Sequence, residues 1–357
     1  MPISTTTQHP AVSAEDLLGL IYRHPGPYTS LYMATAPAHA ADVLPGSHDP
    51  TAVRWQELRT ALEAAGAPDA ALAAIDARLA LPAPDHTAAI AVLAAADGAT
   101  VVDHGMEPPH RDHATVDTLP YVAPLLEWHQ RRVAHLVVTA DAHGTDVASF
   151  GAQHFTQLDR LRGLPLANVE TIVDRAAHVV AELVIVAGPP AIASQLASRL
   201  RDELPHQCRV VAEPDPELTS DELAEQAVRL VGDTAARATV ELLRELRRAS
   251  DQRTVDGTRD TIDALRGGSV DVLMVHDDPD DQRRVWIGDG AEDLFLDDPP
   301  RTNLCHARLV DAAIRSAILQ GARVHIIPST GRTGPADDTA AFTRGRPGLR
   351  VVDGAAS

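Results

Sequence analysis

The chain has 357 residues, with 50 Asp and Glu against 31 Lys and Arg and a formal net charge of −19. A chain this acidic does not attract nucleic acid through its net field, so any contact with RNA must be local. Every basic residue is an arginine, which excludes mechanisms that need a Schiff-base lysine or a P-loop lysine. Aromatic residues make up only 3% of the chain, which argues against base-stacking surfaces.

The length exceeds one ordinary domain core, and the pattern of elements predicts a mixed α/β (α+β) fold in three domains, at 1–115, 116–250 and 251–357. Cys208 and Cys305 are far apart and form no CxxC, so we expect neither a disulfide framework nor a cysteine zinc site. The sequence shows no signal peptide and no membrane-length apolar run, which predicts a soluble, cytoplasmic protein without membrane contact.

In the first domain, a polar tail precedes a short predicted helix, SAEDLLGLIYR, capped by Ser13. PYTSLYMA alternates like a half-buried strand. From Pro50 the periodicity predicts two helices, followed by two strands. These elements are TAVRWQELRTALEAAG, PDAALAAIDARLA, AAIAVLAA and TVVDHG.

The middle domain opens with two β-rich runs around the turn 141–144, which predicts a hairpin in which Gly144 takes a positive φ. The polar segment HFTQLDRLRGLPLAN predicts a loop. Helices and apolar strands then alternate, as is typical of a layered α/β domain. They are ANVETIVDRAAHVVAE, LVIVAG, AIASQLASRLRDEL and CRVVAE.

A long helix is expected from Ser220 to Ala249, because Thr219 and Glu222 form a capping-box pattern ahead of a helical apolar stripe. Such a helix would be roughly 45 Å long and could join two domains. The last domain shows an α/β/α order. Its predicted elements are a helix stopped by Gly267-Gly268, the strand VDVLMV, an acidic loop, VWIG, the helix CHARLVDAAIRSAILQG and the strand RVHIIP.

Three stretches, taken in order, resemble the bacterial relatives of the archaeal and eukaryotic class-one peptide release factors, over roughly residues 117 to 350. They are YVAPLLEWHQRRVAHLVVTADAHGTDVASFGAQ, AELVIVAGPPAIASQLASRL, and VDGTRDTIDALRGGSVDVLMVHDD with VWIG behind it. The chain is similar to the actinobacterial branch, which includes the ribosome hibernation factor Balon. The resemblance implies a C-terminal domain like the kink-turn-binding ribosomal proteins.

In release factors of this family a Gly-Gly-Gln loop positions water against the peptidyl-tRNA ester. The glycines give backbone freedom and the glutamine places an amide at the reacting carbon. Here the only Gly-Gly pair is Gly267-Gly268, followed by Ser269 in the wrong domain. Gly151-Ala152-Gln153 closes the second hairpin strand, ahead of where the family places its catalytic loop. We therefore expect no catalytic residues.

The codon-reading motif of eukaryotic release factors needs a lysine and is absent. The resemblance then implies a non-enzymatic hibernation factor that occupies the ribosomal A site, from decoding centre to peptidyl-transferase centre, without releasing peptide. It also implies elongation factor Tu as an accompanying partner. We expect a monomer when bound, without cofactor or metal. The alternatives are a peptidyl-tRNA hydrolase using a divergent glutamine, Gln153 or Gln157, and a stress-linked adaptor that binds a protein.

Arginine suits bidentate phosphate contact and base stacking, so arginines near the middle-domain loop and the C-terminus are candidates for contact with ribosomal RNA. We interpret the histidine-rich segment at 104–113 and the acidic run at 277–281 as a solvated loop and a solvated turn. The candidate RNA contacts are Gln153, His154, Arg160, Arg162, Arg332, Arg344 and Arg346.

Overall fold

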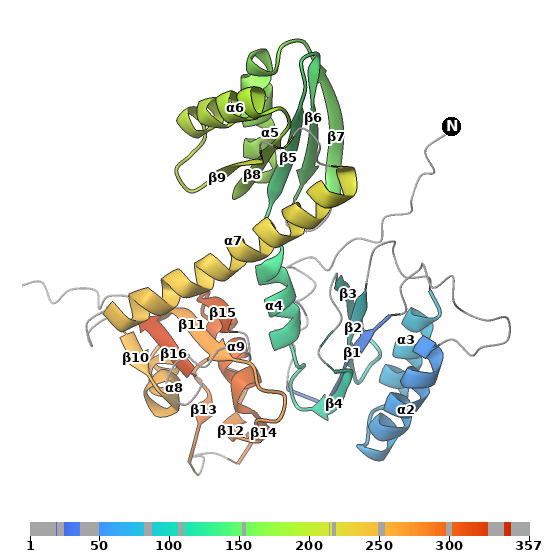
Figure 1. The fold of residues 1–357 in the computed structure, drawn as a ribbon. Helices are drawn as coiled ribbons and strands as arrows, with labels where there is room; N and C mark the ends of the chain where they lie inside the picture. The colour runs from blue at the N-terminus through green and yellow to red at the C-terminus, as the bar shows by residue number, and fades with distance from the viewer. Residues whose placement is uncertain are drawn as a thin grey trace, which may run out of the picture. The chain divides into compact units, whose positions relative to one another are not determined.

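The computed structural model is described at residues 19, 25–35, 50–81, 88–105, 109, 111–151, 155–213, 215, 219–248, 254–297, 302–327 and 339–343. Its contacts divide the chain into two compact units. Unit 1 comprises Met1–Glu127 and Leu246–Ser357, and unit 2 comprises Trp128–Glu245. The predicted fold class, a mixture of helices and sheets, is confirmed (Figure 1). The boundaries of three domains remain a prediction.

The first part of unit 1 is an antiparallel sheet in the order β3-β2-β1-β4. Two helices pack on one of its faces, and the indole Nε1 of Trp55 in the first donates to Asp76 Oδ1 in the second at 2.8 Å. The predicted strands at 28–34 and 89–95 are confirmed, and they are the two central strands of the sheet. The expectation that the first is half-buried was wrong, because six of its seven residues are buried. The elements are β1 Tyr28–Ala34, α2 Pro50–Ala64, α3 Asp69–Leu79, β2 Ala89–Ala95, β3 Thr100–Gly105 and β4 His113–Asp117.

The rest of unit 1 combines a sheet in the order β10-β16-β11-β15 with a smaller sheet in the order β13-β12-β14. The predicted helix from Cys305 begins only at Leu309, because Cys305–Arg308 pair with β12 as an antiparallel strand. The elements are β10 Thr254–Asp256, α8 Thr258–Arg266, β11 Val270–His276, β12 Arg284–Ile287, β13 Leu294–Phe295, β14 Cys305–Arg308, α9 Leu309–Leu319, β15 Arg323–Ile327 and β16 Thr339–Thr343.

Unit 2 is a five-stranded sheet in the order β7-β6-β5-β8-β9, with α5 and α6 on one face and α7 against the other (Figure 1). The predicted hairpin is β5 with β6, and β8 runs parallel to both β5 and β9. The elements, from the helix that leads into the unit, are α4 Ala123–Arg131, β5 His135–Ala140, β6 Gly144–Phe150, β7 Phe155–Arg162, the 3-10 helix η1 Pro165–Asn168, α5 Val169–Val179, β8 Leu183–Ala187, α6 Pro190–Glu203, β9 Arg209–Glu213 and α7 Ser220–Arg248.

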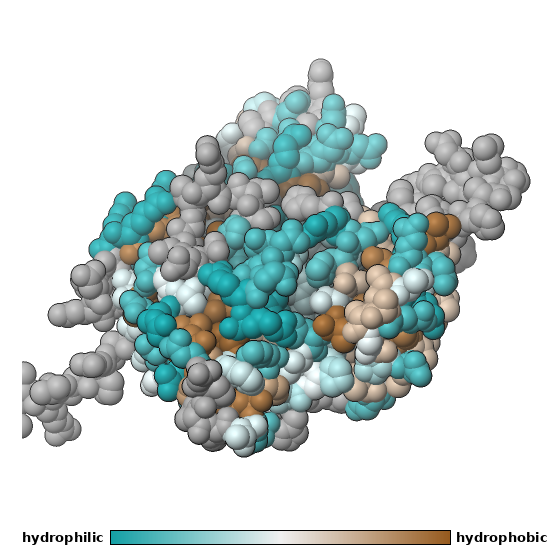
Figure 2. Space-filling model, turned by 90° about the horizontal axis from the view of Figure 1, so that it is seen from below, coloured by the Kyte–Doolittle hydropathy of each residue, from teal (hydrophilic) through white to brown (hydrophobic). Residues whose placement is uncertain are grey.

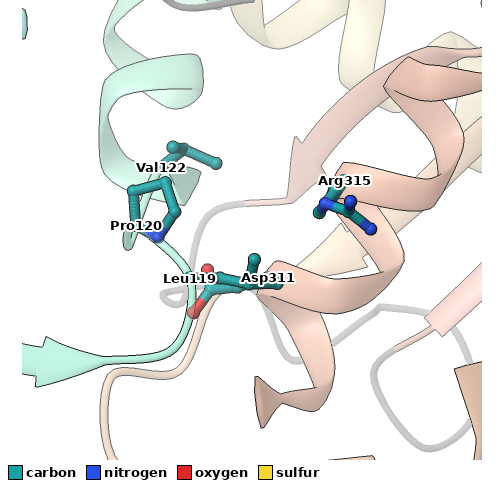
Figure 3. A pocket seen from close by; sticks show the side chains of 5 residues that line it. All are labelled: Leu119, Pro120, Val122, Asp311 and Arg315. Carbon is teal, nitrogen blue, oxygen red and sulfur yellow. The ribbon is translucent and has the colours of Figure 1, made fainter. Parts of the chain in front are cut away.

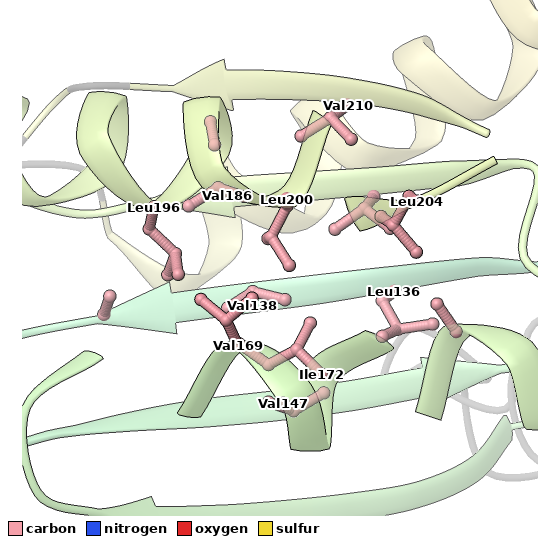
Figure 4. Close-up of a cluster of buried hydrophobic side chains, with 14 of the residues drawn as sticks. Leu136, Val138, Val147, Val169, Ile172, Val186, Leu196, Leu200, Leu204 and Val210 are labelled. Atoms are coloured by element: carbon pink, nitrogen blue, oxygen red, sulfur yellow. The ribbon is translucent and has the colours of Figure 1, made fainter. Parts of the chain in front are cut away.

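Strand β8 is the centre of the unit 2 core. All five residues of LVIVA are buried, because alternate side chains enter opposite layers. Val184 and Val186 face α5 and α6 in the cluster shown in Figure 4, whereas Leu183 and Ile185 join Ala227 of α7. This double burial explains why the strand reads as an unbroken apolar run.

Helix α7 begins as predicted. The N–H of Thr219 donates to Glu222 Oε2 at 2.9 Å, and the N–H of Glu222 donates to Thr219 Oγ1 at 3.3 Å. This reciprocal pair satisfies two of the free N–H groups at the helix start. The expected long helix is therefore confirmed at Ser220–Arg248.

Candidate functional site

The segment predicted as a loop after the hairpin is an edge strand. Residues 155–162 form β7, which pairs antiparallel with β6 from Gly144↔Arg162 to Phe150↔Phe155. The loop prediction was wrong because an edge strand has one ladder partner and one open side, so it can remain largely polar. The sheet edge thus brings the candidates Arg160 and Arg162 beside the hairpin.

The outward face of β7 carries Leu158, Arg160 and Arg162, all of them exposed. Alternation sends the intervening side chains to the other face, where Asp159 pairs with Arg175 of α5 at 2.8 Å and Leu161 packs on the core. Leu158 is 66% exposed, so an apolar side chain accompanies the two arginines at this edge.

Arg160 is paired with two carboxylates. Its Nη1 lies 2.5 Å from Asp146 Oδ2 and its Nη2 lies 3.2 Å from Asp141 Oδ2. Two carboxylates around one guanidinium leave a net negative charge, which opposes contact with phosphate. Of the two strand arginines, Arg162 is therefore the better candidate for RNA.

The hairpin turn is closed by Asp141 rather than by a left-handed glycine. Its Oδ1 accepts from the N–H of His143 at 2.6 Å and of Gly144 at 2.8 Å. The hydrogen bond from His143 is the largest cause of a lowered pKa of Asp141. The expected positive φ at Gly144 was wrong. Glycine is needed because a Cβ would lie 2.7 Å from the carbonyl oxygen of Leu161.

The other candidate RNA contacts lie outside the described residues. They are Gln153, His154, Arg332, Arg344 and Arg346. Ser13, the predicted cap of the first helix, also lies outside the described residues. Their assignments remain predictions.

Unit 1 contains a buried polar cluster that joins its two parts. The hydroxyl of Tyr121 donates to Asp277 Oδ2 at 2.6 Å, and Arg308 Nη2 lies 3.2 Å from Asp277 Oδ1. The Arg308 guanidinium also lies 4.6 Å from the centre of the Tyr121 ring and 3.4 Å from Asp311 Oδ2. The acidic run was expected to be a solvated turn. Asp278 and Asp280 are exposed in a turn closed by the hydrogen bond from Asp281 N–H to the carbonyl of Asp278, but the prediction was wrong for Asp277, which is buried and holds this cluster.

Burial shifts the protonation of the cluster. Burial, strengthened by the nearby charge of Asp277, raises the pKa of Asp311 to about 7 against the opposing effect of Arg308. Burial and Asp277 also raise the pKa of Tyr121 well above its ordinary value. Burial opposes charge on Arg308, but Asp311 and Asp277 outweigh it and raise the pKa of the guanidinium. Arg308 is thus the counter-charge of both Asp277 and Asp311.

A small pocket lies beside this cluster, between the segment before α4 and helix α9 (Figure 3). Leu119, Pro120 and Val122 line one side, and Asp311 and Arg315 line the other. Among the described residues, Asp311 Oδ1 is buried without a hydrogen-bond partner. An unsatisfied buried oxygen favours the protonated carboxyl, in agreement with the raised pKa.

The histidines expected in a solvated loop lie partly in strands. His104 is in β3, and His113 is in β4 with its ring centre 5.0 Å from that of Tyr121. Burial, with Arg308 and Arg111 nearby, lowers the pKa of His113. His110 lies outside the described residues. Where the chain is described, no three His, Cys, Asp or Glu side chains gather as a metal site.

The surface seen in Figure 2 is mainly hydrophilic, and its apolar areas are small and separate. Within the described part of the chain, no helix has the length and hydropathy required to span a membrane.

No protein-family model and no curated protein matches the sequence. Among solved structures, the chain is similar to a ribosome-bound archaeal Pelota, with 15% identity, TM-score 0.42 and coverage of 94% of this chain and 95% of that chain. It is similar to Dom34 of S. cerevisiae, at 9% identity, TM-score 0.40 and 75% of each chain. It is also similar to the archaeal termination factor aRF1, at 16% identity, TM-score 0.24, and 93% and 96% coverage.

Sequence reasoning missed helix α4, the Tyr121 cluster and the strands β4, β7, β10, β13, β14 and β16. The cluster joins residues separated by 156 positions, Tyr121 and Asp277, so local pattern carries no signal for it. The strand β14 was hidden because CHAR continues directly into the helical periodicity of α9.

Proposed function

We propose that this protein binds the ribosome and occupies the A site without releasing peptide, as a hibernation factor. The observation that carries the proposal is the ordered set of release-factor-like stretches over residues 117 to 350 in a chain with no Gly-Gly-Gln. Such a chain keeps the parts that fit the site and lacks the part that performs hydrolysis. The finer assignment to the actinobacterial branch is part of the proposal.

The position of strand β7 supports the proposal that the protein does not release peptide. The interval where the family holds its catalytic loop is occupied by an edge strand, which leaves a four-residue connection at 151–154 and a two-residue connection at 163–164. Short connections on a paired strand do not extend a glycine-rich loop away from the sheet. We therefore propose that unit 2 fills space near the peptidyl-transferase centre rather than acting there.

The proposal includes partners. Elongation factor Tu accompanies the protein, which binds as a monomer, and the C-terminal domain and the adjoining middle domain face this GTPase. The first domain faces the decoding centre but reads no codon, since the chain has no lysine for the codon-reading motif. Arg162 is exposed at the sheet edge and is our first candidate for contact with ribosomal RNA.

The purified chain is expected to sediment with ribosomes through a sucrose cushion at low salt and to dissociate steeply as salt rises, because phosphate contacts release counterions. Transfer RNA bound in the A site should prevent binding, whereas transfer RNA in the P site alone should not. A chain that stays in the supernatant at the lowest salt would instead support the adaptor alternative. Binding to a protein partner that is equally strong at low and at high salt would support it too.

No peptide release is expected when the protein is added to ribosomes that carry labelled peptidyl-tRNA. The reason is that no glutamine here follows a Gly-Gly pair that could place it at the ester. A release factor with its Gly-Gly-Gln intact serves as the positive control. Release that disappears in Gln153→Ala or Gln157→Ala would revive the hydrolase alternative and contradict the proposal.

A further inference from the structure

A row of three rings crosses the small sheet of unit 1. In the register of β13, β12 and β14, Phe295 lies opposite Trp286, and Trp286 lies opposite His306. The ring centres of Trp286 and His306 are 3.7 Å apart at an interplanar angle of 46°. Residues directly opposite each other on antiparallel strands share a face, and neighbouring strands lie about 4.8 Å apart, so the three rings lie next to one another on one face of the sheet.

The row lies on the face of the sheet opposite the core. The alternate residues of the three strands are buried, and helix α9 contacts both β12 and β14. Those residues are Val285, Ile287, Leu294 and Ala307. By contrast, His306 is exposed, and Trp286 and Phe295 are only half-buried. The core therefore does not account for the placement of these rings in a chain that is poor in aromatic residues.

One arginine lies at the Phe295 end of the row and another lies beside its middle ring. The Arg266 guanidinium lies 4.8 Å from the centre of the Phe295 ring. Arg284 lies two residues before Trp286, on the same face of β12. Each arginine also meets a carboxylate, with Arg266 Nη1 3.5 Å from Asp263 Oδ1 and Arg284 Nη2 2.7 Å from Asp117 Oδ1. Both arginine side chains are more than 40% exposed. Arg266 and Asp263 form an exposed pair, which is held weakly enough for a phosphate to compete. Arg284 holds Asp117, whose side chain is only 13% exposed, through both terminal nitrogens, so Arg266 is the more available of the two for phosphate.

We propose that the Phe295–Trp286–His306 row binds unpaired bases of single-stranded RNA, with Arg266 and Arg284 meeting the phosphates. Rings on a sheet face stack bases whatever their sequence, and flanking guanidiniums supply charge that an acidic chain otherwise lacks. A basic peptide would meet the like charge of Arg266 and Arg284 beside the row. That the bound RNA is ribosomal rests on the proposed function. The proposal that this surface binds single-stranded RNA does not depend on it.

The test measures binding of an end-labelled ten-nucleotide polyuridine to the full chain by fluorescence anisotropy at low salt. Trp286→Ala should weaken binding on the order of tenfold or more, and Trp286→Phe should retain most of it, because stacking needs only an aromatic face. His306→Ala, at an exposed position, provides a second variant whose folding is not at risk. Arg199→Ala in α6, an exposed arginine paired with Glu203, is the matched control and should change nothing.

Unchanged affinity in both Trp286→Ala and His306→Ala would overturn the inference, as would binding of an arginine-rich peptide in preference to RNA. Sedimentation with ribosomes is read separately. If wild type fails to sediment but binds the oligonucleotide through Trp286, the proposed function fails and the RNA surface stands. If wild type sediments and the two variants match it in both assays, the surface fails and the proposed function stands.

Discussion

Replacing Asp311 with asparagine is expected to remove a loss of stability that the wild type shows as pH rises from about 4 to 7. The carboxyl is 3% exposed, and this burial, together with the charge of Asp277, raises its pKa to about 7 in the folded protein against an ordinary 3.8, although Arg308 opposes the shift. A group whose pKa is raised by folding contributes stability that is present below its unfolded pKa and lost as pH passes its folded pKa.

The difference amounts to roughly 4 kcal/mol at most, since each pKa unit corresponds to about 1.4 kcal/mol. Urea unfolding at pH 4 and pH 8 checks it. The asparagine side chain of the variant stays neutral, so its stability should not show this loss between the two pH values. Asp260→Asn, at an exposed position of α8, should leave the wild-type profile unchanged. Parallel pH profiles for wild type and Asp311→Asn would show that the buried carboxyl does not titrate in this range.

Gly188→Ala is expected to destabilise unit 2 by about 3 kcal/mol or more. Gly188 follows β8 with φ +137°, and a Cβ there would lie 2.2 Å from the carbonyl oxygen of Ala140 in the neighbouring strand. The backbone must move, because a carbonyl in a paired strand cannot rotate away.

Gly163→Ala is the matched control. Gly163 also has a positive φ, +98°, but no atom lies within 4 Å of the position of its Cβ. It should therefore lose only about 1–2 kcal/mol from backbone strain. Thermal unfolding gives the two values, and hydrogen exchange at the amides of β5 locates the damage. Equal losses of stability in the two variants would mean that the contact between the new Cβ and the carbonyl oxygen of Ala140 adds nothing to the destabilisation.

Elements with strong local signals were predictable from the sequence. The apolar run of β8 and the capping box of α7 lie where the pattern placed them, because burial on both faces and helix capping leave marks within a few residues. The edge strand β7 was not predictable in this way. Its polar outward face is indistinguishable from a loop until its partner β6 is known.

Of the candidate site, the sequence identified the arginines but not their surroundings. Arg160 looks available for RNA until cross-strand register brings Asp146 opposite it. The aromatic row was hidden for the same reason. The composition gives only the number of aromatic residues. The register of β13, β12 and β14 is needed to show that Phe295, Trp286 and His306 are neighbours.

Unit 1 is discontinuous in sequence, and this has a consequence for synthesis. The chain leaves unit 1 at Glu127 and returns to it at Leu246, with all of unit 2 between. During translation, Tyr121 is made long before Asp277 and Arg308. Its hydroxyl therefore lacks these two partners while unit 2 emerges from the ribosome. The sheet of β1–β4 and then the sheet of unit 2 can form in the order of synthesis, whereas the Tyr121 cluster that joins the two parts of unit 1 forms only after Asp277 and Arg308 have left the ribosome.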